Sequence, residues 1–247
     1  METIVAIKDL YKKYPNAETP ALDHLQLEIK SGKITGLLGV NGAGKTTTIS
    51  ILFGLLKQDS GTAKVFDLDA HKDSDDIKRL VGLVPQQIAL YPELSAKENL
   101  LYFGSLYQIE KQTLKQRVND LLEDFGLTEA ANKRVKHYSG GMKRRANIIA
   151  GLLHEPKLVI LDEPTAGVDI HSRSLILDYL KKYNALGNSI IYTSHQLEEA
   201  DKICDEIAIL GNGKLIIHDT VAQLKASIPE AKDIEEVFMH YIKPQYH

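Results

Sequence analysis

The sequence is poor in the features that mark secreted and membrane-spanning proteins. Its 247 residues contain a single cysteine, Cys204, which excludes an internal disulfide, favours a reducing compartment and is expected to be a buried structural thiol. No apolar run approaches the roughly 20 residues that a membrane-spanning helix requires. Residues 1–7 also lack the basic start of a secretory signal. We therefore expect a cytoplasmic protein that reaches a membrane only through a partner.

Strong charge and low-complexity sequence are missing as well. The net charge of −3 provides no overall attraction to nucleic acid or acidic lipid, so no nucleic acid is expected as a partner. There are no internal repeats and no Gly/Ser/Pro-rich linkers. The hydrophobic content of 43% suffices for one substantial α/β core. These observations predict a single domain over residues 1–247.

The stretch from Gly39 to Thr47 has the pattern of a phosphate-binding loop, G-x-x-x-x-G-K-[ST]. A buried strand is predicted before it, over residues 33–38, and a helix after it, which is the order that such a loop requires. Its backbone N–H groups can turn toward phosphates, Lys45 adds a cation, and the Thr46 hydroxyl can ligate Mg²⁺. The predicted nucleotide-binding residues are Gly39, Asn41, Gly42, Ala43, Gly44, Lys45, Thr46 and Thr47.

Two kinds of strand are predicted. Residues 22–29 alternate between apolar and polar side chains, whereas residues 33–38 and 158–161 are continuous apolar runs. The first pattern is typical of an antiparallel sheet with one face in water, and the second of a parallel sheet covered on both faces. The sequence therefore predicts an antiparallel β subdomain beside a mostly parallel α/β core.

A helical insertion is predicted within this core. Apolar residues recur at helical spacing over residues 95–106 and 112–125, and Ser95 with Glu98 forms a capping-box pattern. We expect a helical subdomain at about residues 87–155 and a short tail at about 219–247.

Two adjacent acids, Asp162 and Glu163, follow the predicted buried strand at 157–161. Ligands of α/β sheets bind beyond the carboxyl ends of the strands. Asp162 is expected to hold Mg²⁺, and Glu163 to polarise the water that attacks a γ-phosphate.

A second anion-binding terminus is predicted at Ser139, which reads as a helix N-cap. Gly140 and Gly141 would leave the N–H groups of the first turn uncovered. Two copies packed head to tail would use both termini, each phosphate loop being closed by the other copy. A flexible Gly-Gly turn is the alternative. The following basic residues are expected to form a solvated helix face: Lys143, Arg144 and Arg145.

Together these motifs resemble the ATPase subunit of an ATP-binding cassette (ABC) transporter, over about residues 4–217. Residues 39–46 resemble its Walker A motif, 158–163 its Walker B motif and 139–142 its signature motif. The other matching positions are Tyr14 (A-loop aromatic), Gln86 (Q-loop), residues 165–169 ending in Asp169 (D-loop) and His195 (switch histidine). The resemblance implies a P-loop NTPase fold of the ABC type, ATP and Mg²⁺ as cofactors, and ATP hydrolysis.

The resemblance also implies a role for each position. Gln86 would sense Mg²⁺ and the attacking water, His195 would contact the γ-phosphate, and Tyr14 would stack on adenine. Ser139, Gly140 and Gly141 would contact the ATP of the opposite subunit, and Asp169 would lie at the dimer interface. The metal ligands would be Thr46, Gln86 and Asp162.

The signature usually opens with Leu, and here it opens with Tyr138. This signature and residues 233–238 resemble the drug, antibiotic and polysaccharide exporters whose ATPase is a chain separate from the permease. No room for an added ligand-sensing domain is expected after Ile217. The resemblance therefore implies export rather than import, with an integral-membrane permease and a second ATPase subunit, identical or paralogous, as partners on the cytoplasmic face of the membrane.

A permease helix is expected to dock between Gln86 and about Leu101. The apolar residues available there are Val84, Ile88, Leu90, Tyr91 and Leu94, which the protein's own core could also use. The alternatives are an importer ATPase, a soluble ABC ATPase acting on ribosomes or DNA, and a stand-alone nucleotide-binding regulator.

Overall fold

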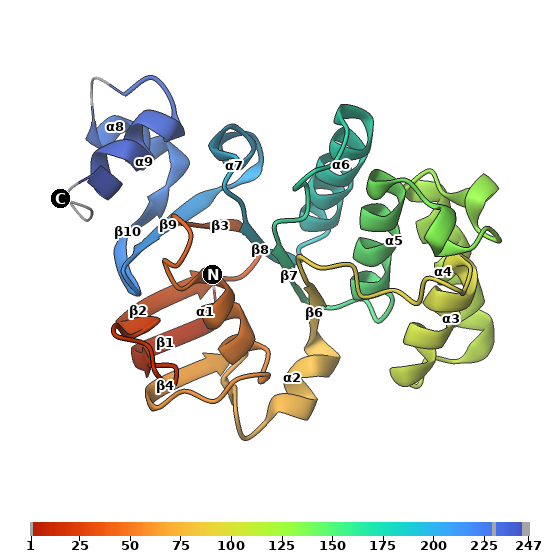
Figure 1. Cartoon of the computed structure of the whole chain (residues 1–247), viewed down its shortest axis with the longest axis horizontal. Helices are drawn as coiled ribbons and strands as arrows, with labels where there is room; N and C mark the ends of the chain where they lie inside the picture. Colours follow the sequence, from red (N-terminus) through yellow and green to blue (C-terminus); the bar gives the residue numbers. More distant parts are fainter. Residues whose placement is uncertain (1, 229–230, 244–247) are drawn as a thin grey trace. The chain divides into compact units, whose positions relative to one another are not determined.

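The computed structural model describes residues 2–228 and 231–243. The chain divides into two compact units (Figure 1). The first unit contains residues 1–78 and 189–247, and the second contains residues 79–188.

The first unit contains an antiparallel sheet with the strand order β2-β1-β4-β5. The strands are β1 (Thr3–Lys12), β2 (Leu22–Lys30), β4 (Ser60–Val65) and β5 (Leu68–Asp69). In β2 the alternating residues Leu25, Leu27 and Ile29 are buried, while their neighbours His24, Gln26 and Glu28 are exposed. The predicted antiparallel subdomain is thereby confirmed.

The other strands of the first unit pair mostly in parallel. The strand β3 (Ile34–Leu38) pairs in parallel with β8 (Ser189–Thr193) and with β9 (Glu206–Gly211), and β10 (Lys214–Thr220) pairs antiparallel with β9. Every residue of β3 and β8 is buried, as the continuous apolar run over residues 33–38 predicted for β3. The helices are α1 (Lys45–Leu52), α7 (Leu197–Ile203), α8 (Val221–Ser227) and α9 (Ile234–Ile242). Cys204 follows α7 and is buried, and its burial raises the pKa of the thiol, as expected of a structural cysteine.

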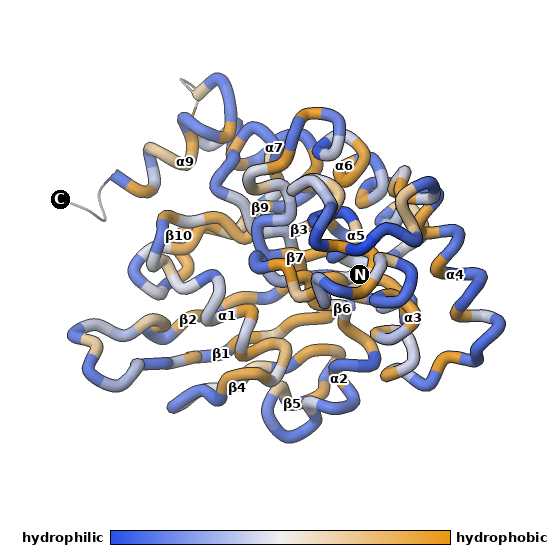
Figure 2. The backbone as a smooth tube through the Cα atoms, turned by 45° about the vertical axis from the view of Figure 1, so that its right-hand side comes forward, coloured by the Kyte–Doolittle hydropathy of each residue, from blue (hydrophilic) through white to orange (hydrophobic). Residues whose placement is uncertain are grey.

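The second unit combines two parallel strands with a group of helices. The strand β6 (Val81–Val84), which follows α2 (Ser74–Leu80), pairs with β7 (Leu158–Asp162). The helices are α3 (Ala96–Leu106), α4 (Lys111–Asp124), α5 (Gly140–Leu152) and α6 (Ile170–Ala185), with short 3₁₀ turns at Thr128–Ala130 and Val135–His137. The capping box of α3 forms as predicted, because Ser95 and Glu98 exchange hydrogen bonds. Figure 2 shows α4 as a mostly hydrophilic helix, whose buried side chains are Leu114, Val118, Leu121 and Leu122.

Helix α5 lies directly against β6. A Cβ atom on Gly82 would meet the backbone oxygen of Gly151, and one on Gly151 would meet Val84. The two glycines therefore allow an approach between helix and strand that a side chain would prevent. Figure 1 shows α5 between α6 and the pair α3 and α4.

The prediction of one domain over 1–247, with a helical subdomain near 87–155 and a tail near 219–247, stays a prediction. Helices α3, α4 and α5 lie within the second of these ranges, and α8 and α9 within the third. No helix in the described part of the chain has the length and apolar character needed to cross a membrane.

Candidate nucleotide-binding site

A pocket of about 300 Å³ lies against the loop that connects β3 to α1 in the first unit. Its lining consists of Tyr14, Ala21 and residues 41–47. The loop ends at Gly44, whose φ of 103° is a backbone conformation that favours glycine. A Cβ atom there would also meet the backbone oxygen of Ala21. The predicted loop residues, except Gly39, therefore line one pocket at the start of α1.

The ammonium group of Lys45 lies across this loop. Its Nζ donates hydrogen bonds to the carbonyl oxygens of Gly39 at 2.7 Å and Val40 at 3.2 Å, and the side chain is only 8% exposed. The cation is therefore held against the loop backbone, with the N-terminus of α1 directly following. Both features favour a bound anion.

Tyr14 reaches the same pocket from the segment after β1. Its hydroxyl lies 3.3 Å from Oγ1 of Thr47, and its side chain is 42% exposed. The two residues are 33 positions apart in the sequence. The structure thus places an exposed aromatic ring at the phosphate-binding loop, where a nucleotide base can stack on it.

His195 also belongs to the first unit, but it does not line this pocket. It is an exposed residue of the turn between β8 and α7. A buried hydrogen bond fixes that turn, because the hydroxyl of Tyr192 in β8 donates to the carboxylate of Glu199 in α7 at 2.5 Å. The histidine is therefore presented to solvent from an anchored turn.

Gln86 and Glu163 are brought together in the second unit. Nε2 of Gln86 donates to Oε2 of Glu163 at 2.9 Å, although 77 positions separate the residues. Glu163 follows β7 with a φ of 49°, which is uncommon for a residue other than glycine. Such backbone strain is concentrated at functional sites. Asp162, the last residue of β7, is buried.

The expectation that Arg144 and Arg145 face solvent is wrong. Their side chains are only 6% and 7% exposed. Arg144 donates to the carbonyl oxygens of Pro85 and Gln86, and Arg145 donates to those of Phe125 and Gly126. Burial lowers the pKa of both guanidinium groups, although nearby carboxylates act in the opposite direction and raise it. A sequence signal for this burial exists, because residues 146–153 are almost all apolar and so indicate a helix buried on all sides.

Ser139 is the N-cap of α5, as predicted. Its hydroxyl accepts a hydrogen bond from the backbone N–H of Met142 at 3.2 Å. The preceding Tyr138 is 5% exposed, and its hydroxyl donates to the carbonyl oxygen of Ala130 at 2.7 Å. Burial raises the pKa of this phenol. The departure from leucine at this position therefore adds a hydrogen bond to the start of the signature segment.

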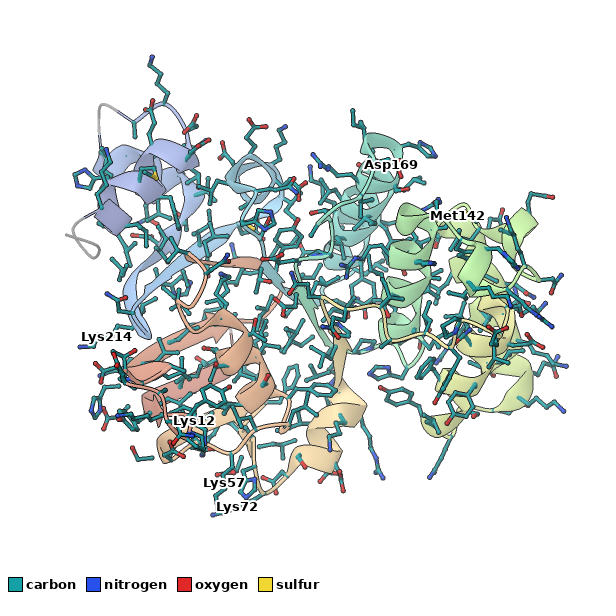
Figure 3. The ribbon with its side chains drawn as sticks, viewed as in Figure 1. Lys12, Lys57, Lys72, Met142, Asp169 and Lys214 are labelled. Atoms are coloured by element: carbon teal, nitrogen blue, oxygen red, sulfur yellow. The ribbon has the colours of Figure 1, made fainter. Side chains whose placement is uncertain are left out.

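Gly141 and Asp169 connect the beginnings of α5 and α6. A Cβ atom on Gly141 would meet the side chains of Ser172 and Asp169. Asp169 is the N-cap of α6, and it accepts hydrogen bonds from the backbone N–H of Ser172 at 2.9 Å and from its hydroxyl at 2.8 Å. These bonds lower the pKa of Asp169. Figure 3 labels Met142 and Asp169 at these neighbouring helix ends.

The structure thus brings together some of the predicted residues within each unit, whereas His195 stands apart from the pocket. The first unit joins Tyr14 to the phosphate-binding loop. The second unit joins Gln86 to Glu163, and Gly141 of the signature segment to Asp169.

The sequence model of the ABC transporter family matches residues 22–166, which is more than half of the chain. The chain belongs to this family. The matched range of this ABC cassette contains the phosphate-binding loop, Gln86, the signature segment and Glu163, and it ends before Asp169 and His195.

Relatives of the cassette include proteins named for antibiotic and drug resistance. The linearmycin resistance ATP-binding protein LnrL of Bacillus subtilis is 46% identical over 200 residues, which is 81% of this chain and 64% of LnrL. The doxorubicin resistance ATP-binding protein DrrA of Mycobacterium tuberculosis is 38% identical over 221 residues, which is 90% of this chain and 67% of DrrA. The chain therefore spans about two thirds of the length of these relatives.

Solved ABC structures confirm the predicted fold. An ATP-binding subunit of an ABC transporter superposes with a TM-score of 0.88 at 27% identity, covering 97% of this chain and 99% of that one. A dimeric ATP-binding cassette in a post-hydrolysis state, bound to ADP and Pi, superposes with a TM-score of 0.80 at 26% identity, covering 88% of this chain and 98% of that one.

Proposed function

We propose that the chain binds ATP at its phosphate-binding loop and hydrolyses it with Glu163 as the general base. The observation that carries this proposal is the hydrogen bond from Gln86 to Glu163 at the end of β7. Through this bond the neutral amide of Gln86 orients the carboxylate of Glu163, whose own backbone has a positive φ. A carboxylate positioned in this way can accept a proton from an attacking water molecule. His195 would contact the γ-phosphate, and Tyr14 would stack on adenine.

We assign Mg²⁺ to three oxygen donors, Thr46, Asp162 and Gln86. The hydroxyl, carboxylate and carboxamide oxygens that they offer are the hard ligands that Mg²⁺ prefers, so the donor set fits the ion. Thr46 is exposed at the phosphate-binding loop, and Asp162 ends β7. When bound, Mg²⁺ neutralises charge on the β- and γ-phosphate oxygens.

We further propose that the active form contains two ATPase subunits, identical or paralogous. Ser139, Gly140 and Gly141 would contact the ATP of the opposite subunit, and Asp169 would lie at the interface. The dimeric cassette bound to ADP and Pi supports this assembly. The N-terminus of α5 also has the N–H groups and the dipole that stabilise an anion.

The hydrolysis would power export through a separate membrane permease, with this subunit on its cytoplasmic face. Support comes from the resistance proteins among the relatives, which favour export over import and over a role on ribosomes or DNA. The exposed large apolar side chains of the second unit include Ile88 and Tyr91, which lie in the segment expected to contact a permease helix, and Tyr102, whose ring packs against Tyr91. The rings of Tyr91, Tyr102 and Phe103 pack against one another there. Val84 and Leu90 are buried, so they belong to the protein's own core and are not available to a permease helix.

The substitution Glu163→Gln tests the hydrolytic part of the proposal. It keeps a hydrogen-bonding side chain at this position but removes the proton acceptor. Steady-state turnover is expected to fall by about 10²–10⁴-fold. Binding of ATP, measured by calorimetry, is expected to stay intact, and an ATP-bound dimer should accumulate in gel filtration. Near-normal turnover in this variant would exclude Glu163 as the base.

Co-purification from native membranes tests the transport part. A multi-span protein that is captured with this chain and alters its turnover would support the proposal. Capture of ribosomal or DNA-bound partners in its place would contradict it.

A further inference from the structure

The buried face of α5 contacts β6 and also the loop after β6, which carries Gln86. Gly151 contacts β6 at Gly82 and Leu83. One turn toward the N-terminus, the side chain of Asn147 accepts a hydrogen bond from the backbone N–H of Ala89 at 3.0 Å. One turn further on, Arg144 contacts the backbone of Gln86. The spacing of three and four residues places all three positions on one face of the helix.

Arg144 holds this loop by two hydrogen bonds. One terminal nitrogen of its guanidinium group donates to the carbonyl oxygen of Pro85 at 3.1 Å, and the other donates to that of Gln86 at 2.7 Å. The guanidinium group presents these two donors from two nitrogens in a fixed planar geometry, whereas lysine has a single nitrogen at the end of a flexible chain. The orientation of the backbone at Gln86 is therefore set by the helix that begins at the signature segment.

The guanidinium group of Arg144 also interacts electrostatically with the carboxylates of Glu163 and Asp162. They attract its positive charge and so oppose the lowering of its pKa by burial. A buried charge costs free energy unless it is compensated, and here the compensation comes from the Gln86 loop and from the acids at the end of β7.

We propose that Arg144 is a positioning residue, whose two hydrogen bonds to the Gln86 loop hold the amide of Gln86 against Glu163. The signature helix and the carboxylate of Glu163 are then connected through one side chain. A displacement of the N-terminal half of α5 moves the backbone of Gln86, and with it the hydrogen bond that orients Glu163. This inference rests on the proposed function of Glu163.

Three variants of α5 separate positioning from helix stability. Arg144→Met removes both donors, and Arg144→Lys keeps the charge but not the two parallel N–H groups. Arg145→Met is the matched control, because it removes a buried guanidinium that also bonds two carbonyl groups, but outside the Gln86 loop. Circular dichroism verifies that each variant is folded, and Arg144→Lys carries the test if Arg144→Met fails to fold.

Amide hydrogen exchange over residues 86–89 tests the contact without any requirement for activity. Exchange in this segment is expected to accelerate in Arg144→Met and Arg144→Lys, and to stay near the wild-type rate in Arg145→Met. Unchanged exchange in both Arg144 variants would overturn the proposal.

Kinetics of the full-length protein test the consequence for Glu163. We expect Arg144→Met to lower kcat about tenfold or more, because small misplacements of catalytic groups have effects of this size, while the affinity for a non-hydrolysable ATP analogue changes by less than about twofold. In a Gln86→Ala background the further loss is expected to vanish. An equal loss in both backgrounds, or full recovery of kcat by Arg144→Lys, would overturn the proposal. Failure of the proposed function would give different results. Wild-type protein would show no turnover, or Glu163→Gln would keep full turnover. The amide hydrogen exchange of residues 86–89 would not depend on either result.

Discussion

The hydroxyl of Tyr138 provides a test of how the signature segment is held in place. The ring is 5% exposed, and the hydroxyl donates to the carbonyl oxygen of Ala130 at 2.7 Å. Tyr138→Phe removes this one oxygen and leaves the apolar contacts of the ring. Ala130 itself is half-buried, so water can compensate its carbonyl group in part.

The expected cost follows from that environment. A net hydrogen bond between neutral groups contributes about 0.5–1.5 kcal/mol, so the free energy of unfolding should fall by about 1 kcal/mol. For a chain of 247 residues this corresponds to a decrease in Tm of about 2–4 °C. Urea unfolding followed by circular dichroism measures the effect as a lower midpoint with an unchanged slope.

Tyr107→Phe is the matched control for this measurement. Tyr107 is also a partly buried tyrosine, with its ring stacked on His154, and its hydroxyl makes no hydrogen bond with the described residues. Its removal is expected to leave the unfolding midpoint within about 0.3 kcal/mol of the wild type. Equal effects of the two substitutions would refute a specific contribution of the bond from Tyr138 to Ala130.

Two further substitutions test packing and titration in the second unit. Gly141→Ala should lower the free energy of unfolding by about 1–3 kcal/mol, because the new methyl group would crowd Ser172. Gly140→Ala is its control, since the nearest contact of a Cβ atom there is 4.0 Å away. Equal thermal midpoints for the two variants would contradict this account. For His154, burial lowers the pKa below the ordinary value of 6.5, so the unfolded state takes up a proton first. The stability contributed by neutral His154 is therefore present above about pH 6.5 and is lost as the pH falls toward the lowered pKa. His154→Phe keeps a stacking ring and should flatten the dependence of the urea midpoint on pH in this range, whereas an unchanged slope would assign the dependence to other groups.

Local patterns in the sequence were sufficient to predict several elements of the site. The strand–loop–helix order around residues 39–47, the N-cap at Ser139 and the capping box at Ser95 and Glu98 all form as expected. Each depends on residues within a few positions of one another, so the preferences of the chain itself specify it. The continuous apolar runs likewise predicted the buried strands β3 and β7.

The surroundings of the basic residues could not be predicted in the same way. A run of three cations suggested a solvated face, yet Arg144 and Arg145 are buried and bond carbonyl groups that lie 58 and 20 positions away in the sequence. The need for glycine at Gly141 likewise arises from Ser172 and Asp169 on another helix.

The sequence by itself therefore determined the family, the phosphate-binding loop and the helix caps of this protein. Only the tertiary structure decided that Gln86 contacts Glu163, that Tyr14 lies beside Thr47 and that Arg144 holds the Gln86 loop. The physical reason is the range of the interactions. A helix cap is completed by neighbouring residues, whereas a buried charge or a side-chain contact across 77 positions depends on which surfaces the folded chain brings together.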